Sequence, residues 1–148
     1  MWNEIEQEKR IADHLFYVSL KYAKTTDVII NLLIRWESLL NKCMELMLKR
    51  AKKNKEIKEI PSAPKAKELA IREIYGNETV QKVMDLYSLF RKVLETEKIR
   101  EHEFRKNVAL RLINTPLDKE IVINMEKLKE WNSLLENFIS YVRHIEGK

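Results

Sequence analysis

Residues 27–52 read DVIINLLIRWESLLNKCMELMLKRAK, a stretch with neither glycine nor proline that predicts one long amphipathic helix. Its apolar residues recur every three or four positions, from Leu33 through Trp36 and Leu40 to Met47. This is the spacing of one face of an α-helix. The stretch therefore places a long helix, with one side made to be buried, at the centre of the fold.

The same spacing extends back to residue 12, and residues 3–52 as a whole lack glycine and proline. A single helix of that length would measure about 75 Å at 1.5 Å per residue, too long to pack inside a domain of this size. The segment Thr25 to Asp27 offers a break, because a Thr or Asp side chain at a helix start accepts hydrogen bonds from the first free amides. We expect two antiparallel helices, at about 3–24 and 27–52. One continuous helix in an intermolecular coiled coil is the alternative.

Proline, glycine and asparagine punctuate the middle of the chain. Pro64 suits the first turn of a helix, which we expect at about 64–74. Gly76 is expected to end that helix in a left-handed conformation. Asn77 can then cap a longer helix running from residue 78 to about residue 103, whose last part is almost entirely charged.

After residue 107 the apolar period changes to two, since Val108, Leu110 and Leu112 alternate with other residues before a turn at 114–118. This pattern predicts a β-hairpin at about 107–123, which must pack against the helices to be stable. Asn124 should cap a final helix at about 125–145. The predicted fold is mainly α, an up-and-down bundle of four to five helices in one domain (1–148) with one small β-hairpin before the last helix.

The composition excludes several classes of enzyme. With two glycines, the chain cannot form a phosphate-binding P-loop, a dinucleotide fingerprint or a nucleophile elbow. One cysteine and three histidines cannot build a zinc finger, and no histidine stands in a Glu-x-x-His or His-Glu-x-x-His motif. We predict no catalytic residue, no metal site and no cofactor.

The surroundings of the protein can also be inferred. The lone Cys43 and the charged first ten residues favour a cytoplasmic protein without a signal sequence, and no apolar run approaches the length of a membrane span. The abundance of Lys and Glu, with glutamine only at positions 7 and 81, is typical of proteins from thermophiles. We expect a thermophilic, archaeal source.

Most single residues of interest have a structural interpretation. We expect Cys43 to be a buried thiol and His14 to pack in the core, and His144 suits the negative end of its helix. Four aromatic residues lie at helical spacing and are also expected in the core: Trp36, Tyr87, Phe90 and Trp131.

Two charged segments are candidate sites. Residues 49–58 hold one glutamate and six basic residues, an excess of five that equals the net charge of the whole protein. Such a cluster can neutralise phosphates, although it is more typical of a solvated helix end. Its basic residues are Lys49, Arg50, Lys52, Lys53, Lys55 and Lys58.

The second segment, residues 98–106, contains Arg100, His102 and Arg105. A histidine beside carboxylates can act as a general base, and the two arginines could bind a phosphate. Mixed charge of this kind is more typical of a solvated helix surface.

The order of an apolar helical hairpin, a charged middle helix and a final amphipathic helix resembles the HEPN class of small helical bundles. Residues 12–22, ADHLFYVSLKY, also resemble the start of uncharacterised helical proteins from archaea. Catalytic HEPN proteins cleave RNA and carry Arg followed by His after four to six residues. Here only three residues separate Arg10 from His14, so the resemblance implies a non-catalytic member.

Three functions follow from the sequence. The first is a non-catalytic interaction or oligomerisation module, which binds a second copy or another protein through its apolar helix faces. The alternative is binding of a nucleic-acid backbone, RNA or DNA, by the basic segment 49–58. RNA cleavage centred on His102 is the third.

Overall fold

The computed structural model describes residues 1–115 and 119–147. Helices and strands follow one another as α1 Trp2–His14, π-helix η1 Leu15–Ser19, α2 Leu20–Tyr22, α3 Thr26–Lys53, α4 Pro64–Ile74, α5 Glu78–Arg91, β1 Glu97–Glu101, β2 Ala109–Ile113, β3 Ile121–Asn124 and α6 Met125–Glu146. The described chain is mainly helical, with a small antiparallel sheet before the final helix, as the sequence predicts.

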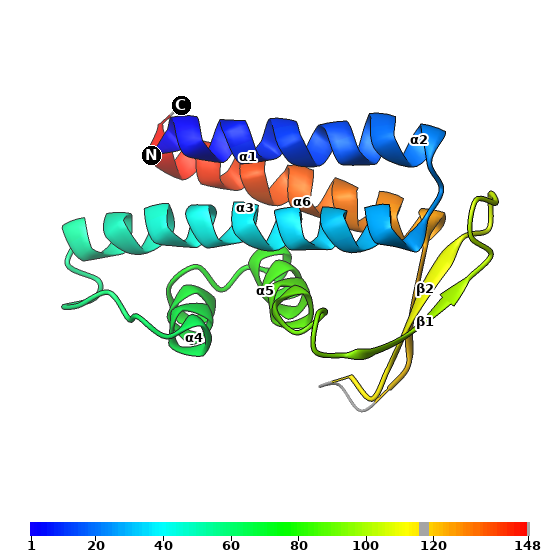
Figure 1. Cartoon of the computed structure of the whole chain (residues 1–148). Helices are drawn as coiled ribbons and strands as arrows, with labels where there is room; N and C mark the ends of the chain where they lie inside the picture. The colour runs from blue at the N-terminus through cyan, green and yellow to red at the C-terminus, as the bar shows by residue number, and fades with distance from the viewer. Residues whose placement is uncertain (116–118, 148) are drawn as a thin grey trace.

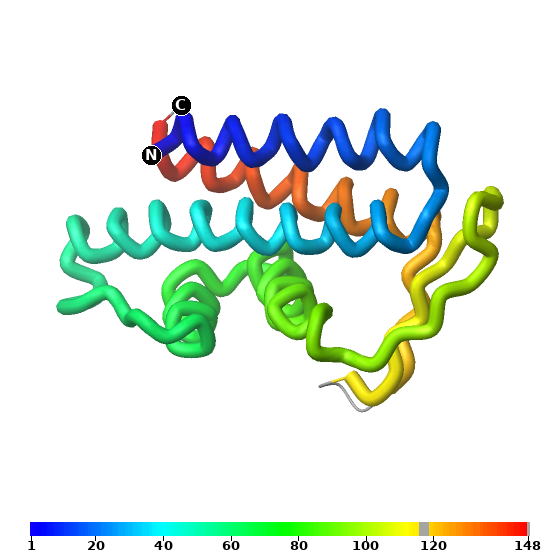
Figure 2. Tube along the Cα trace, in the orientation of Figure 1, coloured from blue at the N-terminus to red at the C-terminus, as the bar shows by residue number. Residues whose placement is uncertain are grey.

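The three longest helical segments run alongside one another (Figure 1). The first comprises α1, η1 and α2 in direct succession, and it lies beside α3 and α6. Helices α4 and α5 pack on α3 and run across the long helices, and the sheet lies near the end of the bundle where α3 begins. The two chain ends lie close together at the other end, as the trace in Figure 2 shows.

A break separates α2 from α3 where the sequence predicts it. Thr25 is extended, and its hydroxyl accepts a hydrogen bond from the Val28 amide at 3.3 Å. The predicted antiparallel pair at about 3–24 and 27–52 is confirmed, and the alternative of one continuous helix is wrong. The cap satisfies an amide that has no partner within the helix.

Two further caps are confirmed. The Asn77 side chain accepts from the Val80 amide at 2.9 Å, and that of Asn124 accepts from the Lys127 amide at 2.8 Å. The expectation for Gly76 is wrong, because its φ is not positive. Glycine is needed there for a different reason: a Cβ atom would lie 2.7 Å from the Arg72 carbonyl oxygen.

The sheet has the order β1-β2-β3, with both pairs antiparallel. Leu110 pairs with Ile123, which confirms the predicted hairpin, although part of its turn (116–118) lies outside the described residues. The predicted helix at 78–103 is wrong beyond Arg91, because residues 97–101 form β1. Ile99 is the only apolar residue in β1, so a helix here would have no apolar face to bury, whereas pairing with β2 satisfies the backbone.

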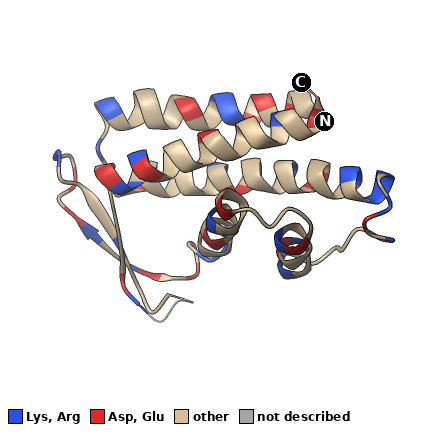
Figure 3. Ribbon diagram, turned by 180° about the vertical axis from the view of Figure 1, so that it is seen from behind, with Lys and Arg blue, Asp and Glu red and all other residues tan. Residues whose placement is uncertain are grey.

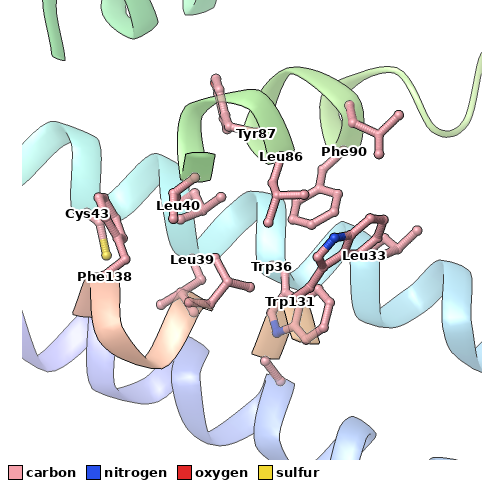
Figure 4. Packing of buried hydrophobic residues seen from close by; sticks show 14 of the residues in the cluster. Leu33, Trp36, Leu39, Leu40, Cys43, Leu86, Tyr87, Phe90, Trp131 and Phe138 are labelled. Atoms are coloured by element: carbon pink, nitrogen blue, oxygen red, sulfur yellow. The ribbon is translucent and has the colours of Figure 1, made fainter. Parts of the chain in front are cut away.

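The core forms where the long helices meet α5 (Figure 4). A chain of aromatic rings links four elements: Phe16 of η1 lies 6.4 Å from Trp36 of α3, which lies 5.8 Å from Phe90 of α5, which lies 5.7 Å from Trp131 of α6. Tyr87 is also buried, so the four predicted core aromatics are confirmed. Aromatic side chains contribute more buried apolar area than other residues, so this row holds the elements together.

Two predictions about single residues have opposite outcomes. Cys43 is fully buried, as predicted, and burial raises the pKa of its thiol to about 12. The prediction that His14 packs in the core is wrong, since its side chain is exposed. His14 lies on the rim of a groove of about 500 Å³ between the first helix and α3, together with Asn31 and Arg35.

Candidate functional site

The C-terminal end of α3 and the residues that follow it carry the six basic residues of segment 49–58, which we call the basic end. The helix closes with a Schellman motif, in which the Glu56 amide donates to the Ala51 carbonyl (2.9 Å) and the Lys55 amide donates to the Lys52 carbonyl (3.0 Å). Lys55 takes the left-handed conformation of this motif, with φ 62°. The motif fixes the backbone from which the basic side chains project.

The six side chains of the basic end face solvent. Arg50 is half-buried and the other five residues are exposed. Among the residues that the structure describes, none of the six forms an ion pair, whereas Lys9, Arg72 and Arg111 each pair with two carboxylates. The cluster of Lys and Arg at this end of α3 is visible in Figure 3.

A shallow pocket of about 250 Å³ lies within the basic end. Lys49, Arg50 and Lys53 line it together with Met1 and Glu146 of the chain ends. Near the same end of α3, the hydroxyl of Tyr75, the residue after α4, donates to the Met47 carbonyl at 2.8 Å. Burial, with smaller contributions from Glu56 and Tyr141, raises the pKa of Tyr75 to about 12, although Arg50 opposes the shift. Tyr75 is therefore a neutral anchor of α4 at physiological pH.

The second predicted cluster is divided by the fold. Arg100 donates from one guanidinium nitrogen to Asp27 at 2.5 Å and to the Thr26 hydroxyl at 2.9 Å. Glu103 accepts from the Thr26 amide at 2.7 Å, and a carboxylate at the start of α3 suits the positive end of the helix. His102 and Arg105 stay exposed on the β1–β2 turn. Arg100 is thus occupied in fixing the sheet to α3.

The β1–β2 turn and the end of α2 present two aromatic rings that sequence reasoning did not single out as functional. Phe104 is 77% exposed and Tyr22 is 80% exposed. The Phe104 amide donates to the Lys24 carbonyl at 2.7 Å, which joins the two segments. We call residues 21–24 and 102–106 the aromatic tip. It lies at the opposite end of α3 from the basic end (Figures 1 and 2).

The backbone of the aromatic tip is strained. His102 has φ 54° and Phe104 has φ 65°, and a bulky side chain is uncommon in this left-handed region. Such a conformation costs roughly 1–2 kcal/mol for a residue other than glycine. Hydrogen bonds to the start of α3 therefore stabilise the turn in a shape that its own residues disfavour.

The π-helix η1 explains why Tyr22 is exposed. The helical spacing read from the sequence places residue 22 on the apolar face. A π turn adds one residue, which rotates all following side chains by about 100°. Leu20 accordingly is fully buried, while Tyr17, Val18 and Tyr22 face outwards. No sequence pattern marks a π turn, so this exposure was not predictable.

A partly buried ion cluster joins α4 to α5. Glu68 binds Arg72 (3.0 Å), which also binds Asp85 (2.8 Å), and the Arg91 guanidinium lies 5.5 Å from the centre of the Tyr87 ring. Among the described residues, the Glu68 Oε1 and Arg91 Nε atoms are buried without a hydrogen bond. The described residues contain no group of three His, Cys, Asp or Glu side chains able to hold a metal ion. We assign this cluster to packing.

Comparisons with known proteins add no assignment. No family model, no curated protein and no solved structure matches this chain. Within the described residues, no helix is long and apolar enough to span a bilayer.

Proposed function

We propose that this protein binds the phosphate backbone of nucleic acids through its basic end. The observation that carries the proposal is the absence, in the described part of the chain, of any ion-pair partner for the six clustered basic residues. Phosphates replace the small ions that otherwise surround such a cluster, and the release of those ions drives binding.

The helix dipole does not account for the whole cluster. Lys and Arg in the last turn of a helix are stabilised by its negative end, which applies to Arg50, Lys52 and Lys53. The effect falls off within one turn, so it gives no reason for Lys55 and Lys58, which follow the helix. A surface that binds an anion accounts both for the basic residues in the last turn of the helix and for those that follow it.

The binding mode would be tolerant of sequence. Five of the six residues are lysines, whose ammonium groups act as point charges on flexible side chains. Contacts to phosphate position a protein on a nucleic acid without reading its bases. Binding is therefore expected to depend strongly on salt and weakly on base sequence.

Titration of a labelled oligonucleotide across a salt series tests the proposal. The variant Lys52→Gln/Lys53→Gln/Lys58→Gln should bind more weakly, and the slope of log affinity against log salt should fall by about 0.7–0.9 for each phosphate contact removed. A matched control is Lys92→Gln/Lys119→Gln/Lys129→Gln, which removes the same charge from exposed positions elsewhere. No binding by the unaltered protein at low salt, or an equal loss in both triple variants, would refute the proposal.

An interaction module that uses apolar helix faces has less support from the structure, because the apolar faces of α3, α5 and α6 are buried in the chain's own core. Sedimentation of the unaltered protein tests this alternative, since a stable dimer would require another contact surface. If the protein is a monomer at micromolar concentration, self-association is excluded, and an interaction module would have to bind a different protein.

RNA cleavage at His102 also has less support. Arg100, one of the two expected phosphate ligands, is held by Asp27, and the HEPN resemblance itself implies a non-catalytic protein. An RNA-cleaving activity abolished by His102→Ala would nevertheless establish this function.

A further inference from the structure

The aromatic tip holds two aromatic rings in solvent on a fixed support. Tyr22 ends α2 and Phe104 lies in the β1–β2 turn, and more than three quarters of each residue is exposed. The Phe104–Lys24 backbone hydrogen bond joins the segments that carry the two rings, and both segments lie at the sheet end of the bundle (Figure 1).

Several hydrogen bonds and one ion pair connect the tip to the start of α3. Glu103 binds the Thr26 amide, Arg100 binds Asp27 and Thr26, and the Arg105 amide donates to the His102 carbonyl at 3.1 Å. These bonds keep Phe104 in a left-handed conformation and its ring away from the core. Strain that the surroundings enforce is concentrated at binding and catalytic sites, which makes this turn a candidate binding site.

Positive charge surrounds the rings. Lys21, Arg105 and Lys106 are exposed, and within the described residues none of them forms an ion pair. The Lys21 ammonium lies 5.9 Å from the centre of the Tyr22 ring. Of the nearby carboxylates, Asp27 is paired with Arg100, and the single charge of Glu103, which accepts from the Thr26 amide, is outnumbered by the three cations. The free charge at the tip is therefore positive and complements an anion.

We propose that the aromatic tip stacks unpaired bases of single-stranded nucleic acid, while its free cations contact the flanking phosphates. Exposed aromatic rings among cations are how sequence-tolerant proteins hold single strands, because every base has a face that can stack. This inference rests on the proposed function and adds to it a preference for single strands. A duplex keeps its bases stacked on one another and cannot offer them to the rings.

A lipid surface fits the tip less well. Membrane-surface segments present a continuous apolar face. Here charged residues flank each ring, Lys21 before Tyr22 and Glu103 and Arg105 around Phe104. Anionic vesicles are nonetheless a necessary arm of the test, because they offer the same negative charge.

The experiment compares phosphatidylglycerol vesicles with three nucleic-acid probes of about 16 nucleotides: an oligoadenylate, a duplex of equal length, and an abasic strand that keeps the phosphates and lacks the bases. Among the nucleic acids, the ranking of affinities is decisive. The unaltered protein should bind the oligoadenylate most tightly. The variant Tyr22→Ala/Phe104→Ala should bind it at least about tenfold more weakly, with little change for the duplex. The matched control Tyr22→Phe/Phe104→Tyr keeps both rings and should bind normally. Both positions are exposed, and circular dichroism verifies that each variant is folded.

The outcomes separate the two proposals. If no probe binds to the unaltered protein, both fail. If the lysine variant of the basic end loses binding while the double alanine variant does not, backbone binding stands and base stacking is refuted. Equal affinity of the unaltered protein for the oligoadenylate and the abasic strand refutes stacking as well. If the double alanine variant loses only its binding to phosphatidylglycerol vesicles, the tip is a lipid site and the inference is wrong.

Discussion

Phe104 shows how a single residue can oppose its own conformational preference. Its left-handed backbone accompanies two neighbouring interactions, namely the hydrogen bond that its amide donates to the Lys24 carbonyl and the capping of α3 by Glu103. The sequence gives no sign of this, because an isolated Phe within a charged segment reads as a surface residue. The prediction for His14 is wrong for a related reason: it has apolar neighbours in sequence, yet its side chain is exposed at the groove between the first helix and α3.

The strain at Phe104 can be measured with two variants that remove the same ring. Phe104→Gly should be more stable than Phe104→Ala by roughly 1 kcal/mol, because glycine adopts φ 65° without the steric cost that alanine bears. Chemical denaturation of both variants gives the difference. If the Phe104→Ala variant were as stable as the Phe104→Gly variant, the backbone of the turn would not be strained.

Cys43 should be unreactive while the protein is folded. The thiolate is the reactive form, and burial raises the thiol pKa to about 12. Labelling with a disulfide reagent at pH 8 should proceed only as fast as the protein opens, and denaturant should accelerate it strongly. Labelling at the rate of a small free thiol without denaturant would contradict the burial of Cys43.

Among the elements, those with an uninterrupted apolar pattern were predictable from sequence. Helices α3, α4 and α6 begin and end close to their expected positions, since each has a cap or a proline at its start. Strand β1 was not predictable, because its residues prefer helix and only pairing with β2 makes them extended. The two candidate sites differ in the same respect. The basic end could be predicted because its residues are neighbours in sequence, whereas the aromatic tip could not, because it depends on the strand β1 and on the π turn.

The start of α3 depends on a distant element, which a substitution can reveal. Glu103→Ala should lower the free energy of unfolding by about 1 kcal/mol, because it removes the carboxylate that accepts from the Thr26 amide. Glu101→Ala is the control variant. It also removes one carboxylate, but that carboxylate pairs with Arg111 on the sheet and does not cap α3. Thermal denaturation of both variants separates capping of α3 from a general loss of charge.

On the scale of the whole molecule, Lys9 connects the first helix to the last. Its ammonium binds Asp13 (2.7 Å) of α1 and Glu136 (2.8 Å) of α6, at a site where the side chain is largely buried. Burial alone would lower its pKa, but the bonds to the two carboxylates outweigh burial and raise it above 10.5. While Asp13 and Glu136 are ionised, the bridge therefore stabilises the fold fully below pH 10.5, and it is lost as the pH rises through the higher pKa of the folded state.

Replacing Lys9 tests this bridge. Lys9→Gln should cost about 1 kcal/mol of stability at neutral pH, where Asp13 and Glu136 remain charged without their partner. Above pH 10.5 the difference from the unaltered protein should shrink. A difference that stays constant across this range in urea denaturation would show that the charge of Lys9 is not what matters.

The side-by-side chain ends of Figure 1 also have a practical consequence. Met1 and Glu146 line the same pocket as Lys49, Arg50 and Lys53. An affinity tag or fusion partner attached to either terminus would therefore project over the basic end, and a charged tag would neutralise or mimic it. The aromatic tip, at the opposite end of α3, would remain uncovered by either fusion.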